Sequence, residues 1–93
     1  MNDNNLEIDV SLDSDFGLHA RPAAILAKEA QKFSADISLS FDGREVDAKS
    51  ILDILTLAAP NGSALRIRAS GEDAPDAVNR IRALISGRFQ DKS

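Results

Sequence analysis

Cysteine is absent from the 93-residue sequence, so disulfide bonds, thiol chemistry and cysteine-ligated metal are excluded. A single histidine is too few for a metal site built on that residue type. Tyrosine and tryptophan are also absent, and four phenylalanines offer little material for stacking nucleic-acid bases. No apolar run approaches the ~20 residues that cross a bilayer, and the polar start Met1–Asn5 lacks the order of a signal peptide. We therefore expect a cytoplasmic protein without metal, cofactor, membrane insertion or bound nucleic acid.

The residues that are present have the composition of an ordinary folded protein. Hydrophobic residues make up 43% of the chain and charged residues 28%, as in soluble globular proteins. The net charge of -4 argues against general nucleic-acid binding, which needs a basic surface. A chain of this length is enough for one compact domain but not for two separate cores. We predict a single domain over residues 1–93, with its core at about 6–89 and a loose tail at 90–93.

Four segments alternate between apolar and polar residues, a pattern typical of strands with one buried face. Asp42 and Gly43 supply a hairpin turn between the second and third of them. One-sided strands predict an antiparallel sheet that is covered on only one face. The four segments are 6–13, 37–41, 44–46 and 65–70.

Three helices are expected to cover that sheet, at 20–33, at about 50–57 and at 74–85. Ser50 is in the N-cap position of the short helix. Asp73 is expected to cap the last helix, and Pro75 fits its first turn. The predicted order is β-α-β-β-α-β-α, an α+β fold with a four-stranded antiparallel sheet under three helices.

The single histidine, His19, lies where the first strand meets the first helix. Pro22 is tolerated there only in the first helical turn, which places His19 at or beside the N-cap. The free backbone N–H groups of Ala20 and Arg21 and the Arg21 guanidinium attract anions, and an imidazole is a competent nucleophile. These groups predict a cradle for a transient phosphoryl group. The alternative is that His19 is an ordinary N-cap residue.

The run from Gly17 to Ala23, GLHARPA, resembles the active-site signature of HPr, the histidine-containing phosphocarrier family of the bacterial phosphoenolpyruvate-dependent phosphotransferase system. The similarity extends through Lys49-Ser50-Ile51 and the last helix. It implies the open-faced β-sandwich of that family and a phosphoryl-group carrier rather than a turnover enzyme. It also implies that enzyme I donates to Nδ1 of His19, that Arg21 contacts the phosphate, and that a IIA component of a sugar transporter or regulatory branch accepts the group.

One departure from the family lies close to the histidine. Many relatives have asparagine or serine shortly before the glycine, whereas this chain has Ser14-Asp15-Phe16. The charge of Asp15 would repel a phosphohistidine mildly unless it points away, and Ser14 is a candidate cap.

The short helix has more large apolar residues than one buried stripe can use. If Ile54 and Leu57 face the sheet, the others are turned toward solvent as a partner-docking patch; the alternative is burial nearly all round. The patch would continue onto the outer side of the first helix beside His19. Its predicted members are Ala24, Ile25, Lys28, Ile51, Leu52 and Leu55.

Ser50 has two interpretations, as an N-cap and as a regulatory site. The resemblance implies the second, because Ser50 matches the serine that HPr kinase/phosphorylase phosphorylates in many bacteria. A phosphate there adds about two negative charges within the patch.

Two other function classes compete with the carrier. A non-catalytic interaction module would bind partners through the apolar patch, and His19→Ala would leave that binding unchanged. An RNA-binding four-stranded domain would need aromatic residues on the exposed face of the sheet, where this chain has Glu7, Asp9, Ser38 and Ser40.

Overall fold

The computed structural model describes residues 5–87 and 89, so the tail expected at 90–93 lies outside the described residues. The element order is the predicted β-α-β-β-α-β-α. Within the described part of the chain, no helix has both the length and the apolar character needed to traverse a membrane. The elements are β1 (Asn5–Ser11), α1 (Ala20–Ala30), β2 (Asp36–Phe41), β3 (Arg44–Asp47), α2 (Ile51–Leu55), β4 (Ala64–Ser70) and α3 (Ala74–Ser86).

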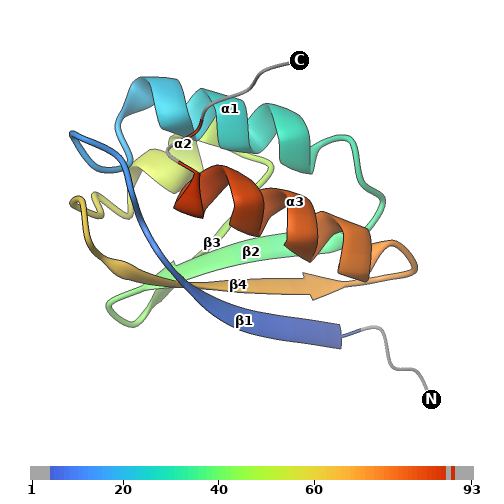
Figure 1. Cartoon of the computed structure of the whole chain (residues 1–93). Coiled ribbons are helices and arrows are strands. Elements are labelled where there is room, and N and C mark those ends of the chain that lie inside the picture. Colours follow the sequence, from blue (N-terminus) through green and yellow to red (C-terminus); the bar gives the residue numbers. More distant parts are fainter. Residues whose placement is uncertain (1–4, 88, 90–93) are drawn as a thin grey trace.

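The four strands form one sheet in the order β1-β4-β2-β3, and every neighbouring pair is antiparallel. All three helices lie on the same side of this sheet (Figure 1). The predicted open-faced arrangement is therefore confirmed.

The strand periodicity separates a buried face from a charged one. Along β4, Leu65 and Ile67 are buried while Arg66 and Arg68 point to the uncovered face. There the Arg66 Nε lies 2.9 Å from a carboxylate oxygen of Asp9. The guanidinium of Arg68 also pairs with carboxylates of β1 and β3, so cross-strand ion pairs occupy the face that no helix covers.

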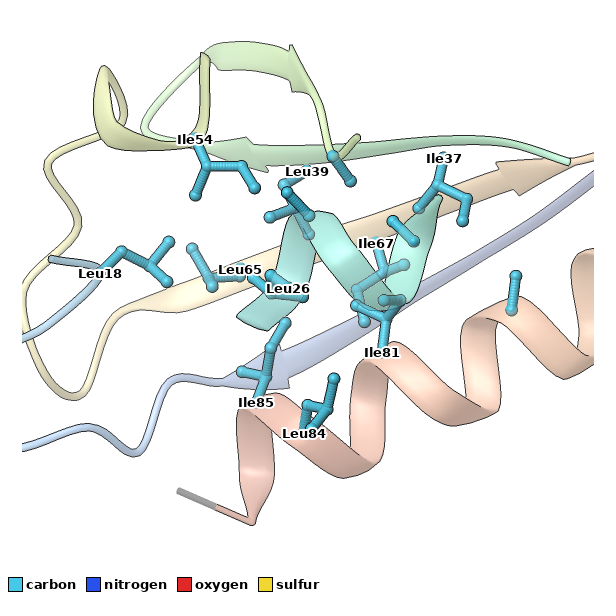
Figure 2. Packing of buried hydrophobic residues seen from close by; sticks show 14 of the residues in the cluster. Leu18, Leu26, Ile37, Leu39, Ile54, Leu65, Ile67, Ile81, Leu84 and Ile85 are labelled. Atoms are coloured by element: carbon cyan, nitrogen blue, oxygen red, sulfur yellow. The ribbon is translucent and has the colours of Figure 1, made fainter. Parts of the chain in front are cut away.

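The core lies between the sheet and the helices, where large aliphatic side chains converge (Figure 2). Leu26 of α1, Ile54 of α2 and Ile81 of α3 are fully buried against Leu39 and Ile67 of the sheet. Each such side chain stabilises the fold by about 1.5–3 kcal/mol when it leaves water. The helices thus hold their positions on the sheet through a continuous apolar layer.

Three predicted elements are too long, and one of them is the short helix, which was expected to reach residue 57 but ends at Leu55. The first strand ends at Ser11 rather than Asp13, because the Leu12 N–H donates to the Ser63 carbonyl and leads the chain into a loop. The first helix ends at Ala30 rather than Phe33, where the Phe33 N–H bonds the Ala30 carbonyl in a tighter turn.

The predicted position of Asp73 is confirmed, but its predicted capping hydrogen bond is wrong. Asp73 occupies the N-cap position of α3, but its side chain makes no capping hydrogen bond. Its carboxylate instead accepts hydrogen bonds from the N–H groups of Ser34 and Ala35, both at 2.8 Å. The bond from Ser34 is the main reason that the pKa of Asp73 lies below its usual value. The side chain therefore ties the start of α3 to the loop before β2.

Candidate functional site

A tight turn precedes the histidine and is closed at both ends by the same two residues. The Gly17 N–H donates to the Ser14 carbonyl at 2.9 Å, and the Ser14 hydroxyl donates to the Gly17 carbonyl at 2.8 Å. The Ser14 N–H donates to Oδ1 of Asn61 at 3.0 Å. Ser14, a candidate cap from the sequence, thus fixes this turn, and Asp15 is exposed at one of its corners.

Position 17 requires glycine because of its backbone conformation and because the Ala59 carbonyl lies close to it. The φ of Gly17 is +76°, in the left-handed region, and a Cβ atom there would lie 2.4 Å from the carbonyl oxygen of Ala59. The same oxygen accepts a 2.9 Å hydrogen bond from the N–H of Leu18, whose side chain is buried. The segment before His19 is therefore pinned to the loop that leads from α2 to β4.

His19 is the N-cap residue of α1, as the position of Pro22 predicts. Its N–H donates to the Gly17 carbonyl and its carbonyl accepts the first helical hydrogen bond from Ala23, both at 3.0 Å. The imidazole makes no capping hydrogen bond and is exposed.

The first turn of α1 leaves two backbone donors without a helical partner. The N–H groups of Ala20 and Arg21 have no carbonyl one turn earlier to bond, and Pro22 has no N–H. The side chain of Arg21 is exposed beside them. An exposed nucleophilic ring thus adjoins the positive end of the α1 dipole.

The sequence analysis missed one residue that contacts the histidine ring. Phe16 occupies the other corner of the turn, and its side chain is 83% exposed. Its ring lies 5.9 Å from the imidazole, centroid to centroid, with an interplanar angle of 78°. The sequence feature that could have indicated this residue is a large apolar side chain inside a turn, between Asp15 and Gly17.

The short helix α2 presents part of the predicted apolar surface. Ser50 is its N-cap, and the serine hydroxyl accepts a 3.2 Å hydrogen bond from the Asp53 N–H. Ile54 is fully buried against the core, whereas Ile51 is 41% and Leu52 is 75% exposed. Leu55, expected to face solvent, is half-buried because it packs on the edge of the core.

The α2 helix runs antiparallel to α1 (Figure 1). At its start, the Lys49 carbonyl accepts a 2.9 Å hydrogen bond from Nε2 of Gln31, just beyond the end of α1. Ser50 is thus displaced from His19 by the length of α1, about 16 Å at the usual helical rise. On α1, Ala24 and Ile25 are half-buried and Lys28 is exposed.

His19 and Arg21 lie on the exposed surface of the protein. A hollow of about 610 Å³ opens near one end of the sheet, lined by residues such as Glu7, Ser38 and Arg68. None of the predicted site residues lines it. His19 lies on the exposed surface, away from this hollow.

Comparisons with known proteins agree on one family. The family model described as "PTS HPr component phosphorylation site" matches residues 6–87. The chain is 40% identical over 86 residues to a phosphocarrier protein HPr of Xylella fastidiosa, covering 92% of this chain and 97% of that protein. A phosphocarrier protein HPr of Haemophilus influenzae is 44% identical over 77 residues, covering 83% and 91% of the two chains.

Solved structures give the same result. The crystal structure of a phosphocarrier protein HPr from Bacillus anthracis superposes with a TM-score of 0.85 at 38% identity. The match covers 89% of this chain and 99% of that one.

Proposed function

Because this chain belongs to the HPr family of phosphocarriers of the phosphotransferase system, we propose that His19 carries the phosphoryl group. The observation that supports this most strongly is the exposed imidazole at the N-cap of α1, next to two backbone donors that have no helical partner. A ring in this place is open to a donor and then to an acceptor.

The transfer itself exchanges one bond to phosphorus for another. The lone pair of Nδ1 of His19 forms the new P–N bond, while the bond between phosphorus and the donor breaks and leaves its electron pair on the donor. The phosphoryl oxygens carry about two negative charges. The N–H groups of Ala20 and Arg21 and the Arg21 guanidinium stabilise that charge. The reverse exchange passes the group to the acceptor, so the chain acts as a carrier and not as a turnover enzyme.

The proposed donor is enzyme I, and the proposed acceptor is a IIA component of a sugar or regulatory branch. Both would dock on the apolar surface of α1 and α2. The large apolar side chains of Ile51 and Leu52 are exposed there, as is typical of a protein-contact surface. Leu52→Ser should leave stability unchanged because the side chain is mostly in water, and it should slow transfer from enzyme I. The proposed docking residues are Ala24, Ile25, Lys28, Ile51, Leu52 and Leu55.

We also propose that Ser50 is a regulatory phosphorylation site for HPr kinase/phosphorylase. A phosphate on this residue would stand at the N-terminus of α2, directly before the exposed Ile51 and Leu52. Its charge would oppose the docking of an acidic partner surface. Incubation with the kinase and ATP should label the wild type and not Ser50→Ala. Equal labelling of the two proteins, or none in either, would contradict this role.

The carrier proposal is tested with phosphoenolpyruvate and enzyme I. The wild type should acquire an acid-labile, base-stable phosphate, and His19→Ala should acquire none. Arg21→Ala should be labelled more slowly with the fold intact, whereas Arg44→Ala, a matched exposed arginine on β3, should behave as the wild type. A phosphate that persists in His19→Ala would refute the proposal. If the wild type is not labelled and binds its partners no better than His19→Ala does, the result would favour an interaction module instead.

A further inference from the structure

Phe16 is a large apolar side chain that the protein leaves in water. It is 83% exposed, more than Leu52 or Ile51, the other exposed large hydrophobic residues of the described chain. The turn that carries it is fixed by the two bonds between Ser14 and Gly17. The exposed ring therefore projects from a turn whose backbone is held by hydrogen bonds.

The distance between Phe16 and His19 determines what must cover that ring. Phosphoryl transfer requires the reacting atoms to approach within about 3–3.5 Å. The phenyl centroid lies 5.9 Å from the imidazole centroid. A protein that brings a phosphoryl-carrying side chain to His19 therefore has to place its neighbouring residues over Phe16.

From this geometry we infer that Phe16 is a partner-specificity residue. It favours donor and acceptor proteins whose phosphoryl-carrying side chain is bordered by an apolar recess that receives the phenyl ring. An apolar recess releases water on contact, whereas a polar surface would lose hydrogen bonds that a phenyl ring does not replace. The inference rests on the proposed function, because it concerns the proteins that exchange phosphoryl groups with His19.

The rigid turn makes Phe16 an efficient anchor. Aromatic side chains near the centre of an interface often dominate its binding energy, since they bring a large area with few rotatable bonds. Here the Ser14 N–H bond to Asn61 and the buried Leu18 hold the backbone on either side of the ring. Little backbone freedom is left to lose when the partner docks.

The test compares two donors on three proteins: the wild type, Phe16→Asn and Phe16→Leu. Phosphorylated enzyme I is a protein donor, whereas phosphoramidate is a small donor whose P–N bond breaks with release of ammonia. With enzyme I, Phe16→Asn should raise the half-saturating concentration by about fivefold or more, and Phe16→Leu by less than about twofold. Labelling of His19 by phosphoramidate should stay within about twofold of the wild type for both variants.

Two results would overturn this inference but leave the proposed function intact. One is a half-saturating concentration of Phe16→Asn for enzyme I equal to that of the wild type. The other is an equal loss of phosphoramidate labelling in Phe16→Asn, because the residue would then act on His19 itself. A wild type that enzyme I does not label at His19 would overturn the proposed function and this inference together.

Discussion

Replacing Gly17 by alanine should damage the site and the fold through one misplaced methyl group. At φ +76° a residue with a Cβ atom costs roughly 1–2 kcal/mol. The new atom would also lie 2.4 Å from the Ala59 carbonyl oxygen, and real contacts of this kind are at least 3.0 Å. Relieving the overlap moves that oxygen away from the Leu18 N–H, a buried hydrogen bond whose loss costs about 1–3 kcal/mol. We expect a total loss of about 2–5 kcal/mol.

Gly43 provides a matched control for this prediction. Its φ of +80° is nearly the same, but a Cβ atom there would meet nothing within 4 Å. Gly43→Ala should therefore cost only the conformational part, about 1–2 kcal/mol, and should leave phosphoryl transfer unchanged. Urea unfolding of both variants can be followed by far-ultraviolet circular dichroism, since the chain has no tryptophan or tyrosine for fluorescence. Equal destabilisation by the two alanines would refute the argument that the Ala59 carbonyl fixes the segment before His19.

Three further predictions concern the rest of the fold. The lowered pKa of Asp73, caused first by the Ser34 N–H, gives stability that is present at neutral pH and lost as the pH falls through the folded pKa. Asp73→Asn should therefore be less stable than the wild type at neutral pH, with a gap that narrows in urea unfolding between about pH 7 and pH 2.5; a constant gap would contradict this. Glu29→Gln should cost about 1 kcal/mol by urea unfolding at neutral pH, because the buried carboxylate pairs with Arg80 across α1 and α3 at 3.0 Å. Ala58→Gly should raise the unfolding free energy by about 0.5–1 kcal/mol, since φ is +49° there, and a loss on substitution would refute the strain.

The sequence predicts the layers of this fold well because burial imposes a simple period. In β4 the alternation of Leu65 and Ile67 with Arg66 and Arg68 gives the two faces of the sheet directly. The place of His19 follows as directly, since Pro22 has to lie in the first turn of α1 and the helix therefore starts near Ala20. Such local rules need no knowledge of the rest of the chain.

Contacts between distant segments could not be predicted in this way. A carboxylate at the start of a helix has a strong local preference to cap it, yet Asp73 bonds Ser34 and Ala35, 39 and 38 residues earlier in the chain. The approach of Ala59 to Gly17 is equally non-local. The sequence indicates that Asp73 and Gly17 have structural roles, but it does not indicate which distant residues they contact.

The exposure of His19 explains why those non-local contacts matter to the site. In the proposed function two proteins reach the imidazole in turn, so the ring cannot be enclosed by the side chains that orient a histidine in an enclosed active site. Its orientation has to come from the backbone instead. The N–H of His19 bonds Gly17, its carbonyl opens α1, and the buried Leu18 N–H holds the segment to Ala59. In such a carrier the backbone contacts of the preceding segment orient the histidine, and the ring itself stays exposed. Gly17 is therefore more sensitive to substitution than the exposed residues around His19.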